Sequence, residues 1–232
     1  MVLYCIFSTI LALAGIGGWL YLFIKDGKLD RVLIRRGLKK RKVNRSPMAI
    51  SWERCLQSMN CRADVVFFGD SLTSAGKFHQ QFPQVKIVNL GSSGEGLASM
   101  LGRVPTLQVL EPKQVFMLGG INGLTDHNVP MSLSQYEDLI CAVKGALPDA
   151  QLFVQSVLPI TRERSRTLCK NETIRRFNAG IQALAQRHGV TYIDLHSLYV
   201  KDGEMDASCV KDGLHLTPEA YGPWYEALRE HI

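Results

Sequence analysis

The stretch FFGDSLTSAGKF, residues 67–78, determines how the rest of the chain is interpreted. It begins inside an apolar run, which predicts a buried strand, and turns polar at Gly69-Asp70-Ser71. A serine in this position is either a helix cap or a nucleophile presented at the end of a strand. A phosphate-binding P-loop is excluded, because six residues rather than four separate Gly69 from Gly76.

Short apolar runs rich in β-branched or aromatic residues recur along the chain and predict five buried strands. They lie at 64–68, 85–90, 114–118, 151–157 and 191–195. Helical stretches are predicted between them, at 97–110, 134–146 and 171–188, and after Thr217. Strands that alternate with helices indicate a parallel sheet covered on both faces.

Candidate functional residues follow the strands. Functional sites of parallel α/β sheets form beyond the carboxyl ends of the strands. Ser71, Gly91 and Asn122 come after the first three predicted strands and are therefore candidates for such a site. In the flavodoxin-like strand order 2-1-3-4-5, the three strands that precede them are neighbours, and we expect these residues to converge. About twenty irregular residues follow the fifth strand and lead to Asp212-Gly213-Leu214-His215. A loop of that length is uncommon without a function, and we expect it to carry His215 back toward Ser71.

These residue types suit nucleophilic catalysis. A serine hydroxyl becomes reactive when an imidazole takes its proton and a carboxylate fixes the imidazole tautomer, and His215 and Asp212 supply both groups. The backbone at Gly91 and the Asn122 amide are candidate donors to a negatively charged oxygen, and no metal or cofactor is required. Each residue alone also fits a structural role, as a cap, a turn or a loop contact.

Taken together, the motifs resemble the SGNH or GDSL family of serine hydrolases. The blocks are Gly-Asp-Ser at 69–71, a glycine at 91, Gly-x-Asn at 120–122 and Asp-x-x-His at 212–215, and the similarity begins at about residue 64. The resemblance implies a three-layer α/β/α sandwich and an esterase or lipase-like activity. It also implies a nucleophile at Ser71, a base at His215, an orienting carboxylate at Asp212 and oxyanion donors at Ser71, Gly91 and Asn122. One residue departs from the family pattern, because Gly123 stands where the family usually has Asp.

The expected function is a membrane-anchored serine esterase that acts on acyl or acetyl esters of a lipid or a carbohydrate. Arg162, Arg164 and Arg166 follow the fourth predicted strand and are candidate contacts for an anionic substrate group, although a solvated basic loop is the favoured interpretation. The alternative function is a membrane-tethered binding or scaffold module that has the same fold without activity.

The membrane expectation comes from residues 2–24, which contain no charged side chain. As a helix this stretch would be roughly 35 Å long, enough to cross a bilayer. A cleaved signal peptide is the competing interpretation, because Ala12-Leu13-Ala14 resembles a cleavage site. The apolar run continues past that point and no positive side chain precedes it, which favours an uncleaved anchor.

A basic segment at 25–46 follows the predicted anchor, and the predicted catalytic domain occupies 47–232. Residues 25–45 contain ten Lys or Arg against two Asp, although the whole chain has a net charge of only +6. Such a cluster attracts anionic lipids and favours a cytoplasmic location for its side of the membrane. No aromatic residues interleave with these charges, so nucleic-acid binding is not indicated. The cysteines show no paired CxxC spacing, which argues against a disulfide framework or a zinc site.

Overall fold

The computed structural model describes residues 47–232 of the chain. The predicted anchor at 2–24 and the basic segment at 25–46 both lie outside these residues. None of the helices in the described part combines the length and the hydropathy that crossing a bilayer would need.

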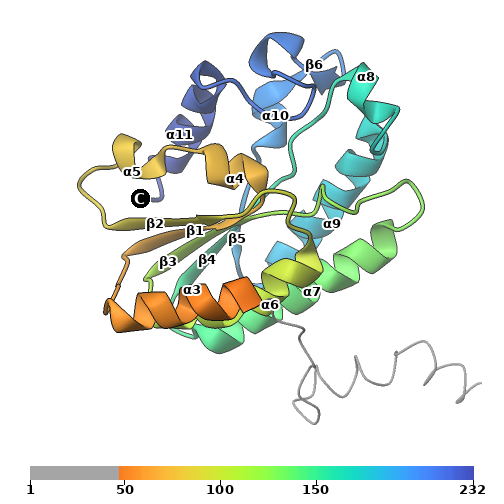
Figure 1. Ribbon diagram of the computed structural model, residues 1–232. Coiled ribbons are helices and arrows are strands. Elements are labelled where there is room, and N and C mark those ends of the chain that lie inside the picture. The colour runs from red at the N-terminus through yellow and green to blue at the C-terminus, as the bar shows by residue number, and fades with distance from the viewer. Residues whose placement is uncertain (1–46) are drawn as a thin grey trace, which may run out of the picture. The chain divides into compact units, whose positions relative to one another are not determined.

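Five parallel strands form the central sheet in the order β2-β1-β3-β4-β5 (Figure 1). Their bounds are Val65–Gly69 for β1, Ile87–Gly91 for β2, Gln114–Leu118 for β3, Gln151–Gln155 for β4 and Thr191–Ile193 for β5. The flavodoxin-like order predicted from the sequence is confirmed. Gly69 at the end of β1 pairs with Gly91 on one side and Leu118 on the other, so the three central strands end level with one another.

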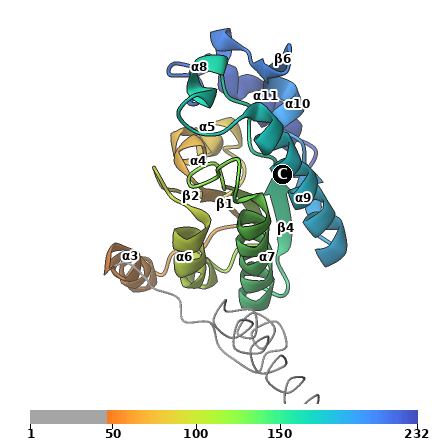
Figure 2. The same ribbon diagram turned by 90° about the vertical axis from the view of Figure 1, so that its right-hand side faces the viewer.

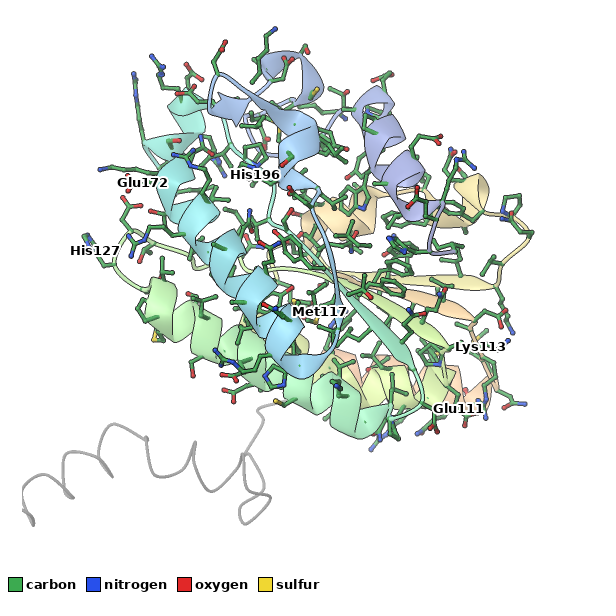
Figure 3. All side chains as sticks on the ribbon, turned by 180° about the vertical axis from the view of Figure 1, so that it is seen from behind. Glu111, Lys113, Met117, His127, Glu172 and His196 are labelled. Carbon is green, nitrogen blue, oxygen red and sulfur yellow. The ribbon has the colours of Figure 1, made fainter. Side chains whose placement is uncertain are left out.

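Helices cover both faces of the sheet, as predicted. On one face lie α3 (Pro47–Ser58), α6 (Leu97–Leu110), α7 (Val129–Ala146) and α9 (Asn171–His188), each beside the next (Figure 2). On the other face lie α5 (Phe78–Gln81) and α11 (Gly222–Leu228). Figure 3 shows Lys113 and Glu111 at the edge where β3 begins, and His127 toward the opposite edge.

An aromatic core fills the space between the sheet and α11. The ring of Phe67 stacks on Phe78 with centroids 3.7 Å apart, and Phe78 meets the edge of Trp224 at 5.7 Å. The Trp224 indole N–H donates to Gln155 Oε1 at 2.7 Å. All four residues are fully buried and three of them are aromatic, so α11 is fixed firmly on the sheet.

Two hydroxyl groups of the C-terminal segment also hold the short helix α4 (Ser71–Ala75) and the turn that follows it. The Tyr221 hydroxyl donates to the carbonyl oxygen of Leu72 at 2.7 Å, and the Tyr225 hydroxyl accepts from the Lys77 N–H at 2.8 Å. Tyr221 belongs to the 3₁₀ helix η2 (Glu219–Tyr221), which forms the start of the helix predicted after Thr217. The last helical segment therefore positions the helix that begins with Ser71.

Two segments differ from the prediction. Helix α7 begins at Val129 rather than at residue 134, because Pro130 is well suited to the first turn of a helix. The stretch after β5, predicted as irregular, contains α10 (His196–Tyr199), the strands β6 (Val200–Lys201) and β7 (Glu204–Met205), and the 3₁₀ helix η1 (Ala207–Cys209). Asp202 and Gly203 connect β6 to β7 with positive φ angles of 51° and 81°, the conformation that an Asp-Gly hairpin turn favours.

Candidate active site

Ser71 stands at the first position of α4, immediately beyond the end of β1. Asp70 caps the helix through its Oδ1 atom, which accepts the Leu72 N–H at 3.0 Å. Glycines let the helix approach the strand ends, because a Cβ at Gly69 would overlap the Thr73 Oγ1 atom of α4. A Cβ at Gly91 would likewise lie 2.1 Å from the Ser74 nitrogen. Both glycines are therefore needed for α4 to pack directly onto β1 and β2.

The long segment after β5 brings His215 to Ser71, as expected. The Ser71 Oγ atom and the His215 Nε2 atom are 2.9 Å apart, and the His215 Nδ1 atom lies 2.8 Å from Asp212 Oδ2. The other Asp212 oxygen accepts the backbone N–H groups of Leu214 at 3.1 Å and His215 at 2.8 Å. Serine, imidazole and carboxylate thus form a continuous hydrogen-bonded chain.

The turn that carries the imidazole is held by its neighbours. Gly213 adopts a φ of 81°, and its carbonyl oxygen accepts the Thr161 N–H at 3.0 Å. The Lys211 N–H donates to the His215 carbonyl oxygen at 2.9 Å. Partial burial opposes ionisation of Asp212, but its hydrogen bonds from His215 and Leu214 outweigh this effect and lower its pKa to about 2. The carboxylate is therefore ionised at neutral pH and accepts the Nδ1–H, which leaves Nε2 free to take the serine proton.

The three candidate oxyanion donors differ in what they already bind. The Ser71 N–H has no acceptor among the described residues. The Asn122 amide uses one hydrogen on the Glu95 carbonyl oxygen at 3.1 Å and retains a second. The Gly91 N–H, in contrast, donates to Asn89 Oδ1 at 2.8 Å, so a substrate oxygen would have to share that hydrogen or displace Asn89. The donor role of Gly91 stays a prediction.

The loop after Asn122 has Gly123 where the resembled family usually has Asp, and Asn128 supplies side-chain hydrogen bonds to this loop. Gly123 has a φ of 94°, a conformation that non-glycine residues rarely adopt. The Asn128 amide donates to the Gly123 carbonyl oxygen at 2.7 Å, and its oxygen accepts the Thr125 N–H at 2.8 Å. Asn128 therefore closes the loop from its far end.

The three candidate arginines lie on and just after α8 (Arg162–Ser165). Arg162 is exposed and forms an ion pair with Glu204 at 2.9 Å, and Arg166 is exposed. Arg164 is half-buried, and a Cβ at Gly213 would lie 3.0 Å from its own Cβ. Its Nε atom is buried without a hydrogen-bond partner among the described residues. Of the three, Arg164 lies against the turn that carries His215.

Sequence reasoning missed Asn89, which organises the serine end of the site. Its amide nitrogen donates to the carbonyl oxygens of Thr73 at 2.8 Å and Gly76 at 3.1 Å, so it joins β2 to α4. The sequence feature that could have indicated this role is a polar amide side chain inside an otherwise apolar predicted strand. Two other histidines lie in different surroundings, with His196 buried and His127 exposed in the loop before α7 (Figure 3). Within the described residues, no group of three His, Cys, Asp or Glu is arranged to hold a metal ion.

Asp70 gives the domain a predictable pH dependence of stability. The side chain is fully buried, and burial raises its pKa to about 7, against the opposing effects of the Leu72 N–H and the His215 charge. From about pH 4 to 7 the unfolded chain loses this proton while the folded chain keeps it, so the contribution to stability falls as pH rises. Asp70→Asn, which retains the oxygen that caps α4, is expected to melt above the native protein at pH 8.

The measurement is thermal unfolding of both proteins from pH 4 to 8. We expect the difference in Tm to shrink as the pH falls and to be small at pH 4, because Asp70 is then neutral in the folded chain and only partly ionised in the unfolded chain, where its ordinary pKa is 3.8. A difference that stays constant across this range would show that Asp70 does not titrate as its burial implies.

Comparison with known proteins identifies relatives across most of the described part. A family model described as the GDSL-like lipase/acylhydrolase family matches residues 67–222. The chain is 24% identical over 162 residues to an N-acylneuraminate cytidylyltransferase of Streptococcus agalactiae serotype V, a match that includes 69% of this chain. It spans only about 37% of the length of that curated relative.

Solved structures show the same fold. A GDSL-like lipase from Bacteroides thetaiotaomicron superposes with a TM-score of 0.66 at 21% identity, over 79% of this chain and 94% of the other. A lipase/acylhydrolase from Enterococcus faecalis superposes with a TM-score of 0.62 at 20% identity, over 72% of this chain and 94% of the other. At these identities the likeness concerns the fold alone.

Proposed function

Because the chain belongs to the GDSL-like lipase/acylhydrolase family of ester-hydrolysing serine hydrolases, we propose that it cleaves carboxylic esters through an acyl-enzyme intermediate on Ser71. The observation that carries the proposal is the contact of 2.9 Å between Ser71 Oγ and His215 Nε2. The second contact, of 2.8 Å between His215 Nδ1 and Asp212, completes the relay. These are the distances that general-base activation of a serine needs.

The proposed reaction has two stages. Ser71 Oγ attacks the ester carbonyl carbon while His215 Nε2 takes the hydroxyl proton, and the ionised Asp212 stabilises the imidazolium. The tetrahedral intermediate collapses, the carbon–oxygen bond to the alcohol breaks, and the departing alkoxide takes the proton from His215. Water then attacks the acyl group, His215 again serves as the base, and the acid leaves as Ser71 regains its proton.

We propose that the negative oxygen of the intermediate is stabilised by the Ser71 N–H and the Asn122 amide, with Gly91 as the third donor. Ser71 N–H has no acceptor among the described residues, and one Asn122 hydrogen remains available after its bond to Glu95. Donors fixed in advance matter because they need no reorganisation as charge develops, and removal of one typically raises the barrier by about 2.7 to 4 kcal/mol.

For the substrate, we propose either a long-chain acyl ester of a lipid or an acetyl ester of a carbohydrate. The test is a matrix of hydrolysis rates that varies acyl length from acetyl to long-chain and the alcohol from sugar to glycerophospholipid. If the protein is instead an inactive scaffold module, we expect it to hydrolyse none of these esters and to show no covalent labelling by a fluorophosphonate. The same experiments therefore separate an enzyme from an inactive module.

Arg164 favours an ester that carries a negative charge. It lies against the His215 turn, and its Nε atom has no partner among the described residues, whereas Arg162 is paired with Glu204. A charge-assisted hydrogen bond contributes about 1.5 to 3 kcal/mol. Arg164→Gln is therefore expected to lower kcat/KM for an anionic ester by roughly tenfold or more, and to leave 4-nitrophenyl acetate hydrolysis unchanged.

Two anionic substrates distinguish the source of the charge. An acetylated sugar acid presents a carboxylate, and a monoacyl glycerophosphate presents a phosphate. The sugar acid is a natural first choice because the curated relative is named for N-acylneuraminate, an acidic sugar. Arg162→Gln and Arg166→Gln are the controls. An equal loss with the neutral ester, or with the Arg166 control, would contradict a specific role for Arg164.

We also propose that residues 2–24 anchor the protein in a membrane and that the basic segment keeps the catalytic domain on the cytoplasmic side. This proposal rests on the sequence alone, on the uncharged run and on the ten Lys or Arg that follow it. A reporter fused after residue 232 and found outside the cytoplasm would contradict the orientation. Release of the protein from membranes in a shortened form would instead indicate cleavage of a signal peptide.

A further inference from the structure

A buried ion pair lies behind the proposed oxyanion donors and has no part in the proton relay. Glu95, which is 5% exposed, contacts Arg103 of α6, with 2.8 Å between Glu95 Oε2 and Arg103 Nη2. The second oxygen of Glu95 accepts the Ser99 hydroxyl at 2.8 Å. Both oxygens of the carboxylate are therefore bound by side chains of one helix.

Arg103 is itself held by two strands of the sheet. Its Nη2 atom donates to the Leu90 carbonyl oxygen of β2 at 2.5 Å. Its guanidinium carbon lies 5.1 Å from the centre of the Phe68 ring of β1, within cation–π distance. The guanidinium thus connects the fixed frame of the sheet to a carboxylate in the loop after β2.

A few backbone hydrogen bonds also hold that loop, because the Ser92 N–H donates to the Gly69 carbonyl oxygen at 2.9 Å and the Glu95 N–H donates to the Ser92 carbonyl oxygen at 3.3 Å. Gly94 and Gly96 flank Glu95, Gly94 has a φ of 72°, and a side chain there would meet no atom within 4 Å. Glycine gives the backbone wide conformational freedom. The Gly96 carbonyl oxygen accepts the N–H groups of Ser99 and Met100, and the Glu95 side chain adds a second connection between this loop and α6.

The same loop contacts Asn122 directly. The Asn122 amide nitrogen donates to the Glu95 carbonyl oxygen at 3.1 Å, and a Cβ at Gly96 would lie 3.2 Å from the Asn122 carbonyl oxygen. An amide NH₂ group is planar, so a bond made by one hydrogen fixes the direction of the other. The place of the Glu95 carbonyl therefore decides where the second Asn122 hydrogen points.

We propose that Glu95 and Arg103 are positioning residues of the active site, which hold the loop so that the Asn122 amide is aimed at the substrate oxygen. The inference rests on the proposed function and adds to it two residues that the relay does not contain. Glu95→Gln is the informative substitution, because it keeps the backbone carbonyl that accepts from Asn122 and removes only the charge that binds Arg103. Any loss must then come from movement of the loop.

The test is a double-mutant cycle on kcat for 4-nitrophenyl acetate with Glu95→Gln, Asn122→Ala and the pair. We expect Glu95→Gln alone to lower kcat roughly tenfold, a fraction of the 10²- to 10³-fold typical for loss of an oxyanion donor. In the Asn122→Ala background the same substitution is expected to change kcat by less than about twofold, because the group that it positions is already gone. Equal losses in both backgrounds would overturn the proposal.

Glu137→Gln is the matched control, because Glu137 is also a buried glutamate in an ion pair, with Arg187 at 3.2 Å, and belongs to α7. It is expected to lower Tm without lowering kcat, whereas an equal loss of kcat in this control would overturn a positional role for Glu95. If Glu95→Gln fails to fold, Arg103→Lys and Ser99→Ala weaken the same contacts more gently and enter the same cycle.

The outcomes separate this inference from the proposed function. If Asn122→Ala has no effect while Ser71→Ala abolishes turnover, the positioning role falls and the serine hydrolase remains. If the native protein hydrolyses no ester, the proposed function falls as well. A readout that needs no turnover is the side-chain amide ¹⁵N resonance of Asn122, which should shift or broaden in Glu95→Gln and stay in place in Glu137→Gln.

Discussion

Ser71→Ala is expected to lower kcat for ester hydrolysis by about a million-fold and to abolish labelling by a fluorophosphonate. The reason is that no other hydroxyl occupies the position 2.9 Å from His215 Nε2 among the described residues. Without that oxygen, no acyl-enzyme forms and only direct attack by water remains. The measurements are steady-state hydrolysis of 4-nitrophenyl acetate and gel fluorescence after labelling.

Ser74→Ala provides the matched control for this experiment. Ser74 belongs to the same short helix and is exposed, so its replacement tests damage to α4 without touching the nucleophile. Hydrolysis and labelling by Ser74→Ala should equal those of the native protein. Full activity of Ser71→Ala would refute the nucleophile assignment.

Asp212→Asn is expected to lower kcat by about 10⁴-fold with little change in KM. The Asn oxygen can still accept the backbone N–H groups of Leu214 and His215, so the turn keeps its shape. The Asn amide, however, donates toward the imidazole Nδ1 atom where the carboxylate accepted. The imidazole must then carry its proton on Nε2, the atom that has to receive the serine proton.

A nearby aspartate offers the control for that substitution. Asp206 also caps a turn, because its Oδ1 atom accepts the Ser208 N–H at 3.0 Å, and it precedes the same segment. Asp206→Asn should retain nearly full kcat. The assays are kcat and KM over a range of pH, and an Asp212→Asn enzyme within tenfold of the native rate would exclude the carboxylate from the relay.

The layout of the sheet followed from the sequence because its signals are local. Each strand of the sheet is a short apolar run, and the helices at Leu97–Leu110 and Asn171–His188 begin and end where the sequence predicted. The approach of His215 to Ser71 was also expected, because Ser71 follows a strand of the parallel sheet and the long loop after the fifth strand could carry His215 back toward it. The contacts between them, across 144 positions of the chain, required the structure.

Residues that act through tertiary contacts were not predictable in this way. Glu95 and Arg103 read as ordinary charged residues of a loop and a helix, since charged side chains are usually exposed. Their pairing depends on the packing of α6 against the first strand, which no local pattern encodes. The bonds from the Asn89 amide to the carbonyl oxygens of Thr73 and Gly76 are similar, because they join β2 to the segment that follows β1.

The position of His215 has a consequence for synthesis of the protein. The proposed nucleophile emerges early and its proposed base 144 residues later, and Tyr221 and Tyr225, which hold α4 and the turn after it, come later still. A polypeptide whose translation stops anywhere between these points carries an inert serine. Esterase activity is thus withheld from incomplete products on the ribosome and appears only when the C-terminal segment has docked.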